Sequence, residues 1–233
     1  STVEKTALAD AEVEYQDHKS DTIYASFPVK SSNIKELKDS EVIIWTTTPW
    51  TIPANRALAY NENLNYLLIE IKDHKVFKNK KIVIAEALLE SVTKECGIKD
   101  FKKINDFKGK NLKGTICKHP FSDLGYDYEI PMLSAQFVTT EQGTGIVHCA
   151  PSHGPDDFNL CLNNGIKAIE TVDGDGKYTN YVKLFEGMHI FKANPTVIEK
   201  LKEQKKLLSN GELVHSYPHS WRSKAPLVHR ATP

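Results

Sequence analysis

Apolar residues along the chain either alternate with polar residues or form short runs, and both patterns are typical of β-strands. Alternation at 11–15 and again at 23–29 predicts two early strands. The short apolar runs predict further strands, which are expected at 42–45, 57–60, 66–71, 82–85, 135–138, 145–149 and 168–172. Strands therefore dominate the expected secondary structure.

Helical spacing of apolar residues is confined to a few segments. Apolar positions three and four residues apart predict a helix after residue 85, with Gly97 directly past its end. A second helix is predicted over 156–163, because acidic residues occupy its first turn and an Asn-Gly pair follows. A third helix begins at Asn194 and Pro195 and carries its apolar face through Leu207 and Leu208.

Length and composition favour an ordinary globular domain. The chain has 233 residues, of which 40% are hydrophobic and 26% charged, and no segment repeats with a period of 20–50 residues. These features predict one β-rich α/β domain over 1–233 with peripheral helices. The apolar runs are too short to cross a bilayer, and the first residues lack the layout of a signal peptide. A cytoplasmic protein without membrane contact is expected.

Charge gives little indication of a nucleic-acid partner. Thirty basic and thirty acidic residues balance, and nearly all the basic residues are lysines. The lysine-rich segment 102–118 is the exception, and it is interpreted either as a solvated loop or as a surface that follows phosphates. Four widely spaced cysteines without a CxxC pair argue against a disulfide framework or a zinc site, so no metal or cofactor is expected.

The first chemically informative block is residues 45–56, with the sequence WTTTPWTIPANR. It follows a predicted buried strand, and Pro49 and Pro53 prevent the strand from continuing. A rigid loop at a strand end is expected to hold the hydroxyls of Thr46, Thr47 and Thr48, which can orient a water or a substrate ester. A threonine-rich turn without function remains the alternative.

The second block is residues 143–158, with the sequence GTGIVHCAPSHGPDDF. A strand is expected to deliver His148, and a loop bounded by proline and glycine then leads to a helix start that carries Asp156 and Asp157. Two acids at a helix N-terminus have a structural explanation, which is compensation of the helix dipole. The functional alternative is that one of them faces a pocket and binds a substrate ammonium.

Two other patterns do not support metal sites. The segment 173–176, DGDG, begins like a calcium loop but lacks the later ligands, so a tight hairpin turn is predicted. His215 and His219 form a pair at metal-binding spacing, as Cys117 and His119 do, and neither pair has a matching half nearby.

Together the two blocks resemble the signature segments of the editing domain of isoleucyl-tRNA synthetases, a connective-peptide insertion in class I aminoacyl-tRNA synthetases. The related leucine and valine enzymes carry a Thr-Thr-Arg-Pro form of the first block, so TTTPW favours the isoleucine type. The edges of the chain, 1–15 and 220–233, resemble the segments that connect the insertion to the Rossmann core. Neither ATP-handling signature of that core is present, so this chain is expected to lack ligase activity.

The resemblance implies a distorted β-barrel core with surrounding helices, and it implies roles for individual residues. The family pattern places Thr46, Thr47, Thr48, Trp50 and Asn55 on one wall of a pocket, and His148 and Asp157 on the opposite wall. Gly145 belongs to the same set as a substrate-binding position. Asp157 is expected to hold the α-ammonium of the aminoacyl group, and His148 to limit side-chain size and contact the terminal ribose.

The implied activity is proofreading, in which the domain hydrolyses valine that was wrongly attached to the isoleucine tRNA. A pocket distinguishes side chains that differ by one methylene by only about 1–3 kcal/mol, so a second, hydrolytic site is needed. The expected partners are the valine-charged acceptor end of tRNA(Ile) and the remainder of the synthetase in cis, and the domain is expected to be a monomer. Two alternatives stay open: a non-catalytic module that binds the tRNA end, and the editing domain of the valine or leucine enzyme.

Overall fold

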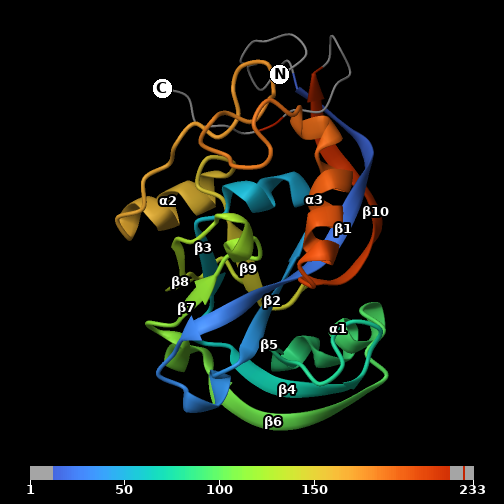
Figure 1. Cartoon of the computed structure of the whole chain (residues 1–233), viewed down its shortest axis with the longest axis vertical. Helices are drawn as coiled ribbons and strands as arrows, with labels where there is room; N and C mark the ends of the chain where they lie inside the picture. The colour runs from blue at the N-terminus through green and yellow to red at the C-terminus, as the bar shows by residue number, and fades with distance from the viewer. Residues whose placement is uncertain (1–12, 221–227, 229–233) are drawn as a thin grey trace.

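A computed structural model describes residues 13–220 and residue 228. Its main feature is a ten-stranded sheet whose path is β6-β4-β5-β2-β1-β7-β8-β3-β9, with β10 paired to β1 (Figure 1). The strands are β1 Val13–Ser31, β2 Ser40–Thr46, β3 Ala57–Tyr60, β4 Asn65–Asp73, β5 Lys81–Ala85, β6 Asp100–Lys108, β7 Ile116–Lys118, β8 Glu129–Ser134, β9 Ile146–Cys149 and β10 Leu207–Ser220.

Helices are short and lie around this sheet. The α-helices are α1 Leu89–Glu95, α2 Pro155–Asn163 and α3 Asn194–Glu203. The short 3-10 helices are η2 Lys35–Leu37, η3 Pro49–Ala54, η4 Glu86–Leu88, η5 Gly109–Leu112, η6 Ser122–Leu124 and η7 Ile190–Lys192. Figure 1 shows α3 beside β1 and β10, whereas α1 lies near β4 at the other end of the molecule.

The β-rich class with peripheral helices is confirmed, although the sheet is not closed into a complete barrel. The strands predicted from continuous apolar runs at 42–45, 57–60, 66–71, 82–85 and 145–149 are all present. Most of their buried side chains form the main hydrophobic core, and Ala57, Ala59 and Cys149 belong to a smaller second cluster. The predicted helices after residue 85 and over 156–163 are present as α1 and α2, and Gly97 takes a positive φ of 65° past the end of α1.

Several predicted boundaries are wrong. The two early strands are one long strand, β1. Residues 135–138 and 168–172 are not strands, although Ala135 and Val138 are buried individually. Leu207 and Leu208 belong to β10 and not to the last helix, because α3 ends at Glu203 and Lys205 adopts a left-handed φ of 57° that reverses the chain. The predicted hairpin turn at 173–176 is confirmed by the bridge between Val172 and Tyr178.

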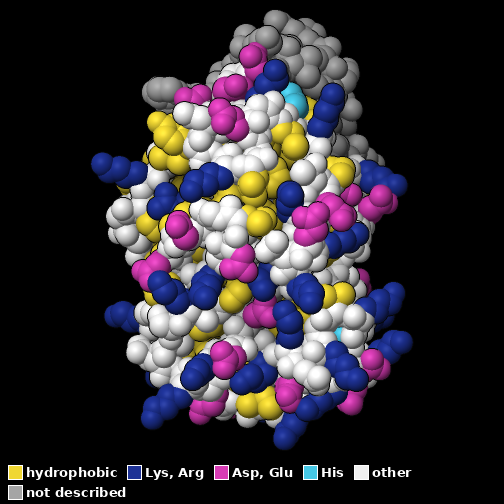
Figure 2. All heavy atoms as spheres, in the orientation of Figure 1, with side chains coloured by type: hydrophobic (Ala, Val, Ile, Leu, Met, Phe, Trp, Pro, Cys, Tyr) yellow, Lys and Arg dark blue, Asp and Glu magenta, His cyan; other side chains and the backbone are white. Residues whose placement is uncertain are grey.

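The lysine-rich segment 102–118 is not a loop, since it contains part of β6, then η5 and β7. β6 is the terminal strand of the sheet path and pairs with β4 alone among the described strands. Exposed lysines on such an edge discourage pairing with another chain. Lys103 and Asp106 form an ion pair of 2.6 Å there. On the face shown in Figure 2, basic and acidic side chains are intermixed.

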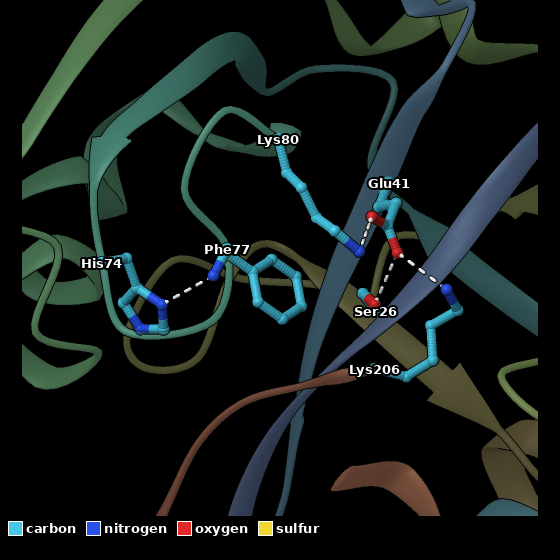
Figure 3. Close-up of polar contacts among 6 residues, drawn as sticks. All are labelled: Ser26, Glu41, His74, Phe77, Lys80 and Lys206. Carbon is cyan, nitrogen blue, oxygen red and sulfur yellow. Dashed lines mark hydrogen bonds and ion pairs between the residues drawn. The ribbon is translucent and has the colours of Figure 1, made fainter. Parts of the chain in front are cut away.

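Glu41, at the N-terminal end of β2, has a buried carboxylate that connects three other segments of the chain (Figure 3). Glu41 accepts a hydrogen bond of 2.8 Å from Ser26 Oγ on β1. Its two oxygens also form ion pairs of 3.1 Å with Lys80 Nζ and 3.5 Å with Lys206 Nζ. Because the lysines come from the turn before β5 and from the approach to β10, the cluster fixes both segments against β2.

The expected connecting segments 1–15 and 220–233 lie outside the described residues, apart from 13–15, 220 and 228. At the ends of the described sheet, Val13 pairs with Ser220. In the described part of the chain, no helix is both long and apolar enough to cross a membrane.

Candidate functional site

The threonine-rich block begins where β2 ends. The β2 interior is buried, whereas Thr46, Thr47 and Thr48 are half-buried. Thr47 and Thr48 form a short irregular connection after β2, as predicted, and Pro49 then opens η3. β2 ends at Thr46, and the fixed φ of Pro49 suits the first position of a helical turn, so the strand does not resume.

The hydroxyls of this block bond mainly to one another and to the local backbone. Thr46 Oγ1 accepts from the Thr48 backbone N–H at 3.1 Å and lies 3.2 Å from Thr48 Oγ1. Thr51 Oγ1 donates to the Thr48 carbonyl at 2.9 Å. The block is therefore held in shape by short-range hydrogen bonds, which is the stiffness that orienting a water or an ester requires.

His148 reaches this block from β9. β9 pairs with β3, and His148 lies opposite Leu58 in that ladder. The imidazole is buried, with Nε2 2.7 Å from Thr51 Oγ1 and Nδ1 2.7 Å from Asn55 Nδ2. The predicted residues Asn55 and His148 are thus brought together from positions 93 apart in sequence.

The hydrogen-bond pattern fixes the tautomer of His148. Asn55 Nδ2 also donates to the Ala57 carbonyl at 3.0 Å, so the amide nitrogen has to face both acceptors. His148 Nδ1 is then the acceptor, and the ring proton resides on Nε2 and is donated to Thr51 Oγ1. Both ring nitrogens are consequently occupied within the protein.

Burial keeps this histidine neutral. Desolvation lowers the pKa of His148 to about 3, and the neighbouring His119 and His153 act in the same direction. His119 is a second buried histidine of this kind, since its Nε2 donates to the Ile52 carbonyl at 2.9 Å and burial lowers its pKa to about 3. Neither ring offers a free basic nitrogen in the described structure.

Asp157 is the acidic group of the site, in the first turn of α2. Its Oδ2 accepts the Ala150 backbone N–H at 3.0 Å, which draws the carboxylate toward the end of β9. Burial raises the pKa of Asp157 to about 6, the Ala150 N–H opposes this rise, and Asp156 adds to it. Asp156 itself is exposed. Asp157 therefore combines partial burial with a raised pKa.

Trp50 is fixed by two hydrogen bonds to its backbone and by a contact of its ring. Its backbone N–H donates to Asn194 Oδ1 at 3.0 Å, and its carbonyl accepts from the Tyr178 hydroxyl. Its ring meets the His153 ring edge-on, with centroids 4.9 Å apart. His153 Nε2 lies 2.6 Å from Thr171 Oγ1. The residue predicted to bind substrate is thus a buried junction between η3, α3 and the segment 171–178.

Gly145 has a packing role that the sequence did not reveal. It adopts a φ of 80°, and a Cβ at this position would come within 2.3 Å of Ala85 Cβ. Its carbonyl accepts from the Tyr66 hydroxyl at 2.7 Å. A glycine is therefore required where the approach to β9 crosses β5, whether or not this residue contacts a substrate.

Thr51 is the residue of this constellation that sequence reasoning missed. It lies within the first block, but nothing in its local sequence indicates a partner 97 positions later in the chain. The four cysteines are buried free thiols. Within the described ranges, no group of three or more His, Cys, Asp or Glu side chains is placed to hold a metal ion.

Comparison with known proteins gives consistent matches. The family model described as the editing domain of leucyl-tRNA synthetase matches residues 19–206. An isoleucine–tRNA ligase of Pelagibacter ubique (strain HTCC1062) is 82% identical over 233 residues, which is 100% of this chain and 26% of that protein. An isoleucine–tRNA ligase of Gluconobacter oxydans (strain 621H) is 44% identical over 250 residues, again 100% of this chain and 26% of that protein. The chain thus spans about a quarter of the length of these relatives.

Solved structures show the same fold at low sequence identity. The crystal structure of GlLeuRS-CP1 superimposes with a TM-score of 0.61 at 13% identity, covering 82% of this chain and 99% of that chain. The P.knowlesi cytosolic leucyl-tRNA synthetase editing domain gives a TM-score of 0.61 at 11% identity, covering 84% of this chain and 96% of that chain. These likenesses establish the architecture alone.

Proposed function

The chain belongs to the family of the leucyl-tRNA synthetase editing domain, and from this premise we propose that it hydrolyses the ester between wrongly attached valine and the isoleucine tRNA. The isoleucine type is supported by the identity to isoleucine–tRNA ligases over the whole chain. The proposed partners are the valine-charged end of tRNA(Ile) and the rest of a synthetase in cis. We further propose that the protein acts as a monomer in the cytoplasm.

The observation that carries this proposal is the state of Asp157. Its Oδ2 is held by the Ala150 N–H, while Oδ1 has no hydrogen-bond or ion-pair partner among the described residues. A half-buried carboxylate with a raised pKa lacks a compensating cation. The α-ammonium of an aminoacyl ester supplies such a cation and forms a charge-assisted hydrogen bond with it.

Discrimination against the correct product has to be steric. Isoleucine is larger than valine and gains more from burial, so affinity alone cannot reject it. We propose that the His148 ring is the wall that meets the additional carbon, with Thr47 and Thr48 on the facing side. The hydrogen bonds of His148 to Thr51 and Asn55 support this role, because they hold the ring in one position.

The same hydrogen bonds argue against His148 as the general base. A base needs a free nitrogen and a pKa near the working pH, and this ring has neither. We propose that the hydroxyls of the threonine block position the attacking water, with assistance from the free hydroxyl of the terminal adenosine. The water proton then passes to solvent or to the departing ribose oxygen, and the ester divides into valine and uncharged tRNA.

A non-catalytic module that binds the tRNA end is the second candidate, because the buried histidines lack a free basic nitrogen. The separating experiment is deacylation of Val-tRNA(Ile) by the 233-residue chain and by a full-length ligase that contains it. The proposal predicts hydrolysis of the valyl ester well above that of the isoleucyl ester. Binding without hydrolysis by either protein would favour the module.

Asp157→Ala tests the residue that carries the proposal. We expect it to abolish deacylation of Val-tRNA in the full-length ligase and to leave isoleucine activation intact, since an ammonium without its partner loses several kcal/mol, on the order of 3. Asp156→Ala is the matched control on the next residue and is expected to cost about 1 kcal/mol of stability at most. Near-normal deacylation by Asp157→Ala would remove this carboxylate from the mechanism.

A further inference from the structure

The first turn of η3 is not capped by its own N-cap residue. Thr48 occupies that position, where a threonine hydroxyl ordinarily accepts the backbone N–H of the second or third helical residue. Thr48 makes no such hydrogen bond. Its Oγ1 lies 3.2 Å from Thr46 Oγ1 and 3.4 Å from Thr51 Oγ1, both longer than the usual O–H···O distance of about 2.7–2.8 Å. The Thr48 hydroxyl is therefore only weakly engaged within the described structure.

One backbone N–H of this turn consequently needs an acceptor from outside η3. Pro49 has no N–H, and the Thr51 N–H bonds to the Thr48 carbonyl at 3.0 Å. The Trp50 N–H is left over, and Trp50 is buried, so an unpaired donor would be costly there. Asn194 supplies the acceptor, since its Oδ1 lies 3.0 Å from the Trp50 nitrogen. The cap of η3 thus comes from 144 positions further along the chain.

Asp21 determines which way the Asn194 amide faces. Asn194 is the first residue of α3, which lies beside β1 and β10 (Figure 1). Its Nδ2 donates to Asp21 Oδ2 on β1 at 3.3 Å. A carboxylate only accepts hydrogen bonds, so the amide nitrogen has to face β1 and the amide oxygen has to face η3. The Trp50 carbonyl also accepts from the Tyr178 hydroxyl, so the Trp50 backbone is held on both sides.

We propose that Asn194 is a positioning residue for the ester hydrolysis, because by capping η3 it leaves the Thr48 hydroxyl available to orient the attacking water. This inference rests on the proposed function and adds a residue outside both signature blocks. Without Asn194, the Thr48 hydroxyl is in the position from which a threonine ordinarily caps, and the Trp50 N–H is the donor that needs it. Rotation of Thr48 into that hydrogen bond would direct its oxygen at the backbone and away from the water.

Asn194→Ala in the full-length ligase is the direct test. We expect kcat for deacylation of Val-tRNA(Ile) to fall about tenfold and KM to stay within about twofold, because Asn194 acts on the Thr48 hydroxyl and not on substrate binding. Glu199→Ala, at an exposed position of the same helix, is the matched control and is expected to change kcat by less than about twofold. A change confined to KM, or an equal loss of kcat in the control, would overturn the proposal.

Exchanging the two polar groups is expected to rescue the activity. Asn194→Asp combined with Asp21→Asn keeps both hydrogen bonds, since the introduced carboxylate accepts the Trp50 N–H and the introduced amide donates to that carboxylate. We expect kcat of this double variant to stay within about threefold of the parent. A loss as large as that of Asn194→Ala would show that the cap does not carry the effect.

Thr48→Val shows whether Asn194 acts through the Thr48 hydroxyl. If it does, adding Asn194→Ala to Thr48→Val lowers kcat by less than about twofold further, whereas independent effects multiply. Multiplied effects would overturn the positioning role, even if each single variant is impaired.

The amide resonance of Trp50 in the 233-residue chain reports the cap without any catalysis. It is expected to shift in Asn194→Ala, while the rest of the amide spectrum shows that the fold is retained. An unchanged resonance would contradict the cap. An inactive parent ligase would contradict the proposed function, and the positioning role with it, whereas an active parent whose kcat is unaffected by Asn194→Ala would contradict the positioning role alone.

Discussion

Buried polar groups are compensated differently at the two ends of β2, by ion pairs at the N-terminal end and by neutral hydrogen bonds beyond the C-terminal end. At the N-terminal end, the carboxylate of Glu41 forms ion pairs with Lys80 and Lys206, and Ser26 donates a hydrogen bond to it. Beyond the last residue, Thr46, the chain uses neutral hydrogen bonds that run through the threonine block to His148. The first arrangement joins three segments of the fold, and the second surrounds the proposed site.

This difference separates fold stabilisation from ligand binding. Because the Glu41 carboxylate is already paired with lysines, a charged ligand would form no additional favourable ion pair there. At the His148 end the described hydrogen bonds are between neutral groups, and the nearby carboxylate of Asp157 lacks a cationic partner. A cationic substrate group therefore gains most at the second end, although both ends belong to one seven-residue strand.

Truncating a side chain at the C-terminal end of β2, where the hydrogen bonds are neutral, is expected to cause the larger loss of stability. His148→Ala leaves a cavity and removes the partners of Asn55 Nδ2 and Thr51 Oγ1, so we expect a loss of about 3 kcal/mol in the free energy of unfolding. In the full-length ligase it is also expected to raise deacylation of Ile-tRNA relative to Val-tRNA. Urea denaturation and the two deacylation rates measure these effects.

Thr51→Val is the matched control for the histidine, because it removes the hydroxyl and keeps the shape of the side chain. We expect a loss of about 1 kcal/mol and a much smaller change in the preference for the valyl ester than in His148→Ala, because Asn55 still holds the ring. If His148→Ala lowers both deacylation rates in proportion, the ring serves catalysis or folding and not discrimination by size. If rates and ratio stay as in the parent, the ring lies outside the substrate pocket.

Substitution at the N-terminal end of β2, where the ion pairs lie, is expected to cause a smaller loss of stability. Glu41→Gln keeps the size of the side chain but leaves Lys80 and Lys206 without their counter-ion, and we expect a loss of about 2 kcal/mol of stability in urea denaturation. Glu212→Gln breaks the exposed ion pair with Lys19 and is expected to cost far less stability, because solvent screens this pair. A similar cost for both substitutions would show that the cluster at Glu41 contributes no more than a surface pair.

The expected effect of removing the Asp157 charge is smaller than that at Glu41 and has the opposite sign. The pKa of Asp157 is raised from 3.8 to about 6 in the folded protein, so ionisation of this carboxyl destabilises the fold progressively as the pH rises from 3.8 to about 6, and the penalty stays constant above that. Asp157→Asn is therefore expected to stabilise the domain by about 1 kcal/mol at pH 7, while it eliminates deacylation. Below about pH 4 the gain is expected to vanish, because the parent carboxyl is then protonated in both states.

Activity and stability should depend on pH in opposite directions at this residue. Deacylation by the parent is expected to fall as the pH drops through about 6, since the ammonium needs the ionised carboxylate. Asp156→Asn, at the exposed neighbour, is the control for a general effect of removing an acid from the first turn of α2. Equal stabilisation by the two substitutions would assign the effect to the helix terminus and not to burial of Asp157.

The parts of the fold that sequence predicted are those in which one strand buries nearly every side chain. β2, β3 and β5 are of this kind, so continuous apolar runs identified them. β6 was missed because most of its side chains are exposed and its pairing depends on β4. The strand predicted at residues 135–138 is wrong for the opposite reason, because Ala135 and Val138 are buried although neither belongs to a strand.

The candidate site was predictable to a similar degree. The two blocks marked the segments that meet, and the structure brings Asn55, Thr51 and His148 into contact. Local sequence could not show that both nitrogens of His148 are occupied, because those partners lie more than 90 residues away along the chain. It also could not indicate that Gly145 is required by Ala85, a contact created only when two strands cross.

The pairing of β1 with β10 has a mechanical consequence. From Ile23 to Pro28, β1 is flanked by β2, whereas from Val13 to Ser20 its described partner is β10 alone. A two-stranded ribbon is marginally stable by itself, so its amide protons are expected to exchange with solvent sooner than those at 23–28. The ribbon is therefore expected to deform more easily than the packed body of the sheet.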